Sequence, residues 1–468
     1  MRTQKEMSKP LAVYVLLLTF TQACWSESIS SIYDLALKND PVMKAARANL
    51  KVGEETENIS KSRLLPSLSS SADYTESERN SSASQVYSFI SADPFLSRSF
   101  SDTQTTSYGI SLNQAVFDLP AWYQFKSGKA LSASAQAQFA SDQQTLIIRV
   151  TNAYLSVLRA FDNNETRKAE QRAIFRQLEQ TKERFEVGLL PITDVHEAQA
   201  IFDDASVNTL EAKGALNIAF DNLEVLTGER YDSLSGLSDN FLAENPNPVD
   251  SSSWVAFALQ NNFDIKIAKF GKDASYNQAK AAASELYPRL TASARYSDSD
   301  TDGSQISYLP SESSSNISSL NDGHSINLSF SMPIWSSGLN ASSRQAKQRA
   351  IASDESYEAV KRTTAQNARA QHQLVITNAA RVKARSQAIT SAESALNATQ
   401  AGYEVGTRNI VDVLSAQRAL FQAKRNYANS KYDYIYAMMS LKQVAGQLSP
   451  DDIYQLNARL DPKIQVIR

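Results

Sequence analysis

Hydrophobic and polar residues alternate along two stretches in the second half of the chain. The apolar positions are Leu290, Ala292, Ala294 and Tyr296 in one stretch and Ile326, Leu328, Phe330 and Met332 in the other. The same pattern returns more faintly at 68–74 and 110–116 in the first half. Alternation with a period of two predicts strands that have one apolar and one polar face.

The four predicted strands have about ten residues each, which is the length that crosses a bilayer when a strand is tilted. We expect the serine-rich segments 76–106 and 298–323 to be long surface loops between them. Only four strands are expected, too few to close a barrel, and an open sheet edge cannot lie in lipid. Several chains would therefore have to pool their strands. A soluble antiparallel sandwich with one wet face is the alternative.

Two other segments show the spacing of long helices. Residues 119–186 contain no helix breaker except Pro120, which suits the first turn behind an Asp118 cap, and 338–404 is the counterpart. About 68 residues at 1.5 Å per residue give a helix of ~100 Å. One apolar stripe follows Ile147, Val150, Tyr154, Val157, Leu158 and Phe161. Such a stripe predicts a coiled-coil seam.

The chain also repeats itself. Residues 185–199 return as 403–417, an offset of 218 (403 − 185), with eight of fifteen positions identical. The identical pairs are Glu186/Glu404, Val187/Val405, Gly188/Gly406, Ile192/Ile410, Asp194/Asp412, Val195/Val413, Ala198/Ala416 and Gln199/Gln417. This period is too long for a solenoid repeat, so it indicates a duplicated half-protein. Each copy lies between two long helical segments and predicts a helix–turn–helix tip.

The expected organisation follows from these landmarks. A signal peptide (1–26) precedes the first repeat (27–227), which holds a helix, a strand pair (66–118), a long helix (119–186), a tip (187–193) and a helix. A polar linker (228–250) leads to the second repeat (251–445), with a helix, a strand pair (288–335), a long helix (338–404), a tip (405–411) and a helix. A C-terminal segment (446–468) ends the chain.

The N-terminus has the order of a secretory signal: basic residues, the apolar run 11–20, then small residues. We expect cleavage before Glu27, which would discard Cys24, the single cysteine. Lipidation of Cys24 is the alternative.

Composition narrows the function classes. The chain has 468 residues, a net charge of −3 and a mean hydropathy of −0.36, which favours neither a helical membrane protein nor a nucleic-acid binder. The histidines His196, His324 and His372 lack ligand spacing, so we expect no metal and no cofactor. The sequence contains no P-loop, serine elbow or cysteine nucleophile, and we expect no enzyme.

Several motifs carry a resemblance to a known family. They are Ala36-x-x-Asn39-x-Pro41, Leu65-Pro66, Asp142-Gln143-Gln144-Thr145-Leu146, Arg184-Phe185-x-Val187-Gly188, Ile192-Thr193-Asp194-Val195, Ser331-Met332-Pro333-Ile334 and Gly402-Tyr403-x-Val405-Gly406-Thr407-Arg408-x-Ile410-Val411-Asp412-Val413-Leu414. Over essentially the whole mature chain, the sequence resembles the TolC family of outer-membrane efflux and secretion channels.

The resemblance implies an α+β membrane protein that forms a homotrimer. Four strands per chain would build a twelve-stranded barrel in the Gram-negative outer membrane, in contact with its lipid. A long periplasmic α-helical barrel with coiled-coil tips would open like an iris, surrounded by a belt made of the linker and the C-terminal segment. The implied partners are a periplasmic adaptor protein and an inner-membrane RND or ABC transporter, with no nucleic acid.

The resemblance also implies roles for residues at the tips. A gating latch would use Tyr403, Arg408 and Gln400 with Asp194, Thr193 and Gln177. Asp412 would ring the pore constriction, and Ser415 stands where the family often has a second acidic ring. The adaptor would meet the tip turns at Val187, Gly188, Leu189, Val405, Gly406 and Thr407.

The expected function is therefore a passive exit duct for efflux pumps or type I secretion systems. The sequence does not choose between drugs and a protein as cargo. The alternative is a secreted coiled-coil structural or adhesive protein.

Overall fold

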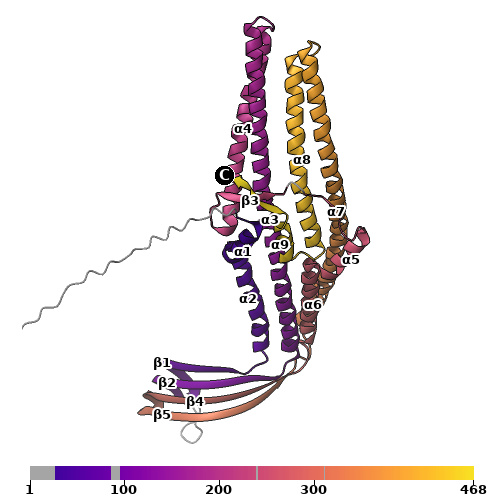
Figure 1. Cartoon of the computed structure of the whole chain (residues 1–468). Helices are drawn as coiled ribbons and strands as arrows, with labels where there is room; N and C mark the ends of the chain where they lie inside the picture. The colour runs from indigo at the N-terminus through magenta and orange to yellow at the C-terminus, as the bar shows by residue number, and fades with distance from the viewer. Residues whose placement is uncertain (1–26, 86–94, 239–240, 310) are drawn as a thin grey trace, which may run out of the picture.

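The computed structural model describes residues 27–85, 95–238, 241–309 and 311–468 (Figure 1). The expected signal peptide and Cys24 lie outside them. The first-half elements are α1 (Ile29–Asn39), α2 (Pro41–Ser62), β1 (Ser67–Gln85), β2 (Phe95–Phe117), α3 (Leu119–Glu186), α4 (Ile192–Thr227) and β3 (Ser233–Leu237). The second-half elements are α5 (Ser251–Asn261), α6 (Phe263–Ser284), β4 (Arg289–Leu309), β5 (Ser311–Ser331), α7 (Ser337–Glu404), α8 (Ile410–Val444), α9 (Pro450–Asn457) and β6 (Leu460–Ile467).

Two helices of 68 residues each, α3 and α7, run from the sheet at one end of the molecule to the tips at the other (Figure 1). Asp118 caps α3 by accepting from the backbone N–H of Ala121, and Ser336 caps α7 by accepting from Leu339. Near the sheet, α2 and α6 complete the helical layer. Beyond the belt, α3 pairs with α4 and α7 pairs with α8 as two hairpins. No helix of the described residues combines the length and apolar character that crossing a membrane requires.

The large sheet is antiparallel throughout, in the order β1-β2-β4-β5. Its strands have 19 to 23 residues, so the expected length of about ten residues is wrong. The segments 76–106 and 298–323, expected as loops, mostly continue the strands. Their serine and threonine side chains remove the alternation from the pattern but still pair across strands, as in Ser81–Ser99 (2.9 Å) and Thr105–Thr301 (3.0 Å).

The expectation of only four strands is also wrong, because β3 in the linker pairs with β6 at the C-terminus. This small sheet joins segments more than 200 residues apart and forms part of the belt around the middle of the helices (Figure 1). Tyr154 of α3 donates its buried hydroxyl to the Ser235 carbonyl at 2.5 Å. The main hydrophobic core lies at this level, with Tyr154, Phe220 and Ile453 buried in it.

Candidate gate at the helix tips

The two tips have the same backbone geometry. Gly188 and Gly406 both have a φ of 78°, the left-handed conformation that ends a helix most easily with glycine. The next backbone N–H donates to the carbonyl five residues earlier, from Leu189 to Arg184 (2.9 Å) and from Thr407 to Gly402 (2.8 Å). These bonds satisfy the last carbonyls of α3 and α7.

The next helix begins sooner than expected at each tip. The turns comprise residues 187–191 and 405–409. The expected tips 187–193 and 405–411 therefore include the first two residues of α4 and of α8, respectively. Asn409 caps α8, which begins at Ile410. Pro191 stands directly before α4, which begins at Ile192. The tip side chains Val187, Leu189 and Val405 are 71%, 71% and 75% exposed. These apolar side chains are therefore available for contact with another protein.

The predicted latch residues lie at or near these tips. Among the described residues of one chain, those of the first tip form no hydrogen bond or ion pair with those of the second. Arg408 Nη1 lies 3.8 Å from Asp412 Oδ2, one turn along its own segment. Thr193 Oγ1 lies 3.4 Å from Asp194 Oδ1. Among the described residues of the single chain, Arg408 and Asp194 form no ion pair with each other. A contact between them remains a prediction for adjacent subunits.

Gln177 and Gln400, the remaining predicted latch residues, lie on α3 and α7 and are both partly buried. Within the described chain neither amide side chain forms a hydrogen bond. The backbone carbonyl of Gln177 accepts from Thr181 Oγ1 at 2.8 Å.

Asp412 is held in the first turn of α8 by a capping box. Its backbone N–H donates to Asn409 Oδ1 at 2.8 Å, and its own Oδ2 accepts from the Asn409 N–H at 3.4 Å. Ser415 is exposed and lies three residues further, on the same face of α8. Val413 and Leu414 are buried, so Asp412 and Ser415 lie on the polar side of this helix.

Sequence reasoning missed the contacts that join the two hairpins within the chain. Arg184 at the end of α3 lies over the ring of Tyr403, with its guanidinium carbon 5.0 Å from the ring centre. The hydroxyl of Tyr403 is buried and has no hydrogen-bond partner among the described residues. Beside it, one apolar cluster combines Ile174, Leu178, Ala198 and Ala205 with Ile410 and Leu414. The helical spacing of Ile410 and Leu414 was the available signal.

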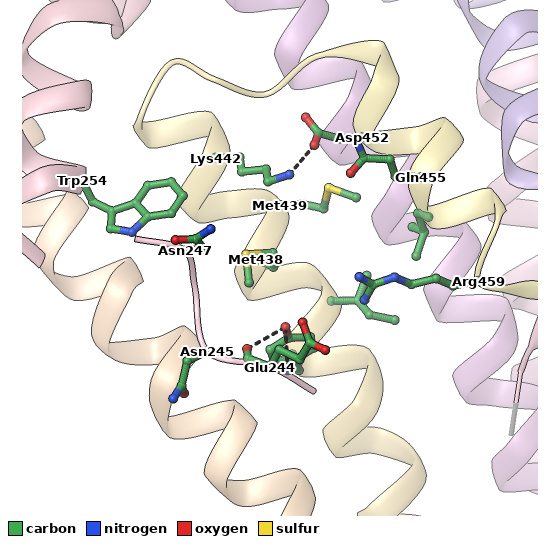
Figure 2. Close-up of a pocket in the computed structure, with 13 residues that line it drawn as sticks. Glu244, Asn245, Asn247, Trp254, Met438, Met439, Lys442, Asp452, Gln455 and Arg459 are labelled. Atoms are coloured by element: carbon green, nitrogen blue, oxygen red, sulfur yellow. Dashed lines mark hydrogen bonds and ion pairs between the residues drawn. The ribbon is translucent and has the colours of Figure 1, made fainter. Parts of the chain in front are cut away.

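The belt contacts the C-terminal part of α8, away from the tips. Figure 2 shows a pocket of about 240 Å³ between α8, α9, the linker and Trp254. Tyr434 donates to the Glu244 carbonyl (2.8 Å) and accepts from the Glu244 N–H (3.1 Å), and Lys442 pairs with Asp452. Burial raises the pKa of Tyr434. These contacts attach the linker and the C-terminal segment to the helix that carries Asp412.

Comparisons with known proteins agree with this architecture. The family model described as "Outer membrane efflux protein" matches residues 32–229 and 254–447. The chain is 33% identical to outer membrane protein TolC of Vibrio cholerae over 96% of this chain and 98% of that protein. It is 31% identical to TolC of Escherichia coli strain K12 (97% and 89%) and 28% identical to the alkaline protease secretion protein AprF of Pseudomonas aeruginosa (90% and 85%).

Among solved structures, the fold is similar to the CmeC outer membrane channel of Campylobacter jejuni. The TM-score is 0.71 at 17% identity, covering 93% of this chain and 90% of that one. The resemblance inferred from the motifs is confirmed. The chain belongs to the outer membrane efflux protein family, located in the Gram-negative outer membrane with a periplasmic extension.

Proposed function

We propose that this protein is an outer-membrane exit duct of export machines and that three copies make one duct. Their sheets would close into a twelve-stranded barrel, and their helix hairpins would line a tunnel through the periplasm. The observation that carries the proposal is the open four-stranded sheet, whose edge strands β1 and β5 have 19 and 21 residues. Unpaired edges of that length cannot lie in lipid, and pairing β5 of one copy with β1 of the next removes them.

The side chains of the sheet support a membrane position. Leu68, Leu112, Ala294 and Ile326 form one row across the four strands. The apolar rows occupy the half of the sheet near the helices and end near Tyr74, Tyr108 and Tyr296, which are exposed. The other face carries mainly serine and threonine. An apolar band bounded by aromatic residues, over a polar lumen, is typical of transmembrane barrels. The remaining half of each strand would extend beyond the membrane.

The tips would close the periplasmic entrance. We propose that Arg408 of one subunit pairs with Asp194 of a neighbour and that Tyr403, Thr193, Gln177 and Gln400 add polar contacts. Arg408 supports this role, because its side chain is 61% exposed and its one ion pair in the described chain is long. A charge-assisted bond repeated by symmetry would be weak singly and effective together.

The partners follow from the same surfaces. The exposed tip residues Val187, Leu189 and Val405 would dock a periplasmic adaptor, together with the turn backbone at Gly188, Gly406 and Thr407. An inner-membrane RND or ABC transporter would supply the cargo. The relative AprF, named for alkaline protease secretion, supports a protein cargo, and the family description "Outer membrane efflux protein" supports a role in efflux. We expect no catalytic activity.

Electrophoresis of unboiled and boiled outer-membrane samples tests the assembly. A barrel trimer should migrate as a large species that boiling converts to the monomer, and it should conduct ions in a planar bilayer. A species whose mobility boiling does not change, and which does not conduct, would favour the structural or adhesive alternative. Deleting the gene and measuring drug susceptibility and the secreted proteome would identify the cargo.

A further inference from the structure

The charged residues of the large sheet are divided unequally between its two faces. Residues two apart along a strand share a face, and so do directly paired residues, so the register assigns each charged side chain to one face. The apolar face, which carries Leu68, Leu112 and Ala294, also carries the carboxylates of the described strands, except that of Asp73. They are Glu76, Glu78, Asp102, Asp298, Asp300, Asp302, Glu312 and Asp322. These carboxylates lie on the outside of the proposed barrel.

The opposite face, which would line the lumen, carries arginines. Arg79, Arg289 and Arg295 belong to it by the same register, and Asp73 is its one carboxylate within the described strands. Arg289 forms an ion pair with Glu285, so its charge is compensated. The side chain of Arg295 is exposed and forms neither an ion pair nor a hydrogen bond with any other described residue. Its charge is therefore available to a solute in the lumen.

Arg295 lies among hydroxyl groups. It pairs with Ser111 on β2 and with Ser325 on β5. Its Nη2 lies 3.8 Å from the position that a Cβ of Gly109 would take, so the guanidinium lies against the wall of β2 where a glycine leaves the surface open. Asp73 is displaced from Arg295 by four residues along the strands (111 − 107), which is about 13 Å. No lumen carboxylate of the described strands therefore compensates Arg295 at its own level.

The wall behind Arg295 is the apolar part of the sheet. Its neighbours Ala294 and Tyr296 lie on the opposite face, in the rows that would contact lipid. A wall of low dielectric constant concentrates the field of a charge in the lumen. Twelve strands about 4.8 Å apart and tilted by about 40° make a barrel about 24 Å across, whose axis is about 12 Å from the backbone. The guanidinium is nearer to the axis than the backbone, and the Debye length is about 10 Å in 0.1 M salt, so its field reaches the centre of the lumen.

We propose that Arg295 determines the charge preference of the barrel, an inference that rests on the proposed trimer. Three copies at one level form a guanidinium ring that favours the passage of solutes carrying carboxylate, sulfate or phosphate groups. Guanidinium groups bind such oxyanions through paired N–H donors, and the neighbouring serine hydroxyls can donate as well. The ring lies in the sheet, at the opposite end of the molecule from Asp412 at the tips (Figure 1). Probes added from the two sides of a channel therefore distinguish the two rings.

Single channels of the full-length trimer in planar bilayers test the ring. Inorganic tripolyphosphate added from the barrel side should block wild-type current in 0.1 M KCl and much less in 1 M KCl, where the Debye length falls to about 3 Å. Arg295→Gln should weaken the block about tenfold and lower the permeability ratio of chloride to potassium about threefold. Arg295→Lys should keep most of the block, because it keeps the charge. Arg98→Gln is the matched control: it removes an exposed arginine from the outer face of the same sheet and should change both readouts less than about twofold.

Several results would overturn the inference. They are a block that Arg295→Gln leaves unchanged, a block that Arg98→Gln weakens equally, and wild-type channels that conduct without being blocked. If Arg295→Gln does not assemble, Ser297→Asp provides a second test, because it places a carboxylate two residues along the same face. It should weaken the block by a similar factor, and an unchanged block would refute the ring. A wild-type protein that forms no channel refutes the proposed function instead.

Discussion

The guanidinium of Arg184 stacks over the ring of Tyr403 at 5.0 Å, so the end of α3 in the first half touches the end of α7 in the second. Tyr403 also packs against two apolar clusters, which include Ile410 and Leu414 in one and Val413 in the other. The tips are therefore joined by contacts inside each chain, in addition to the contacts proposed between chains.

Replacing Arg184 by alanine should loosen the tips. A cation–π contact of about 0.5–1 kcal/mol corresponds to a two- to five-fold change in an equilibrium. We expect uptake of a large antibiotic to rise by about that factor in Arg184→Ala. Uptake should rise less in Arg184→Lys, because lysine keeps the positive charge. Arg176→Ala, at an exposed position on the same helix, is the control. Equal uptake in Arg184→Ala and Arg176→Ala would show that the stacking does not matter.

Tyr403→Phe separates packing from hydrogen bonding, because it keeps the ring and removes only the hydroxyl. Within one chain that hydroxyl has no partner among the described residues, so its loss alone would be neutral. If it bonds to a neighbouring subunit, Arg408→Ser with Tyr403→Phe should leak more than Arg408→Ser, since each lost contact biases the same equilibrium. Uptake is compared at equal trimer levels. Identical leakage in the single and double variants would remove Tyr403 from the latch.

Three Asp412 carboxylates around a narrow pore should attract a multivalent cation. At separations of about 7 Å and an effective dielectric of 20–80, each pair repels by roughly 0.6–2.4 kcal/mol, which a bound cation relieves. A trivalent cation added from the periplasmic side should block single-channel current. Asp412→Asn should nearly abolish the block, while its amide oxygen can still accept from Asn409 in the cap. Ser415→Asp should strengthen the block by adding a second ring. Persistent block in Asp412→Asn would place the constriction elsewhere.

The two tip glycines should respond alike to substitution. Gly188→Ala and Gly406→Ala each place a side chain at a φ of 78° with no neighbouring atom within 4 Å, so the cost is purely conformational, about 1–2 kcal/mol. Both should lower the thermal midpoint of the trimer. Gly214→Ala inside α4, also in open space but with helical geometry, should raise it by removing freedom from the unfolded chain. A rise in all three variants would contradict the left-handed turns.

The belt should lose stability at alkaline pH. Burial raises the pKa of Tyr154 far above its ordinary value of about 10, with the bond to Ser235 opposing, and burial also raises that of Tyr432. The neutral phenols are fully favoured below pH ~10, and their contribution falls as pH rises further, because the unfolded chain ionises first. Tyr154→Phe should cost about 1–2 kcal/mol at neutral pH by removing the buried hydrogen bond from the Tyr154 hydroxyl to the Ser235 carbonyl, and should weaken the alkaline loss. Denaturation followed at pH 7 and 11 measures both effects, with the exposed Tyr436→Phe as control.

Local signals in the sequence determined the helices and the duplication. The cap Asp118, the near absence of breakers over two 68-residue stretches and the glycines Gly188 and Gly406 act through their immediate neighbours, so the pattern alone reveals them. The alternation from Leu290 to Tyr296 revealed a strand because one face of it is apolar.

The tertiary structure decided the rest. The outer halves of the strands are mostly polar, with only scattered apolar side chains such as Phe100 and Ile306, so they show little alternation and are held by backbone ladders to partner strands. The β3–β6 pairing, the Arg184–Tyr403 stack and the buried ion pair of Glu170 with Arg425 join residues more than 200 positions apart. Which charged residue becomes buried beside which partner depends on how two hairpins pack. The spacing of residues along the chain does not encode which distant residues come into contact.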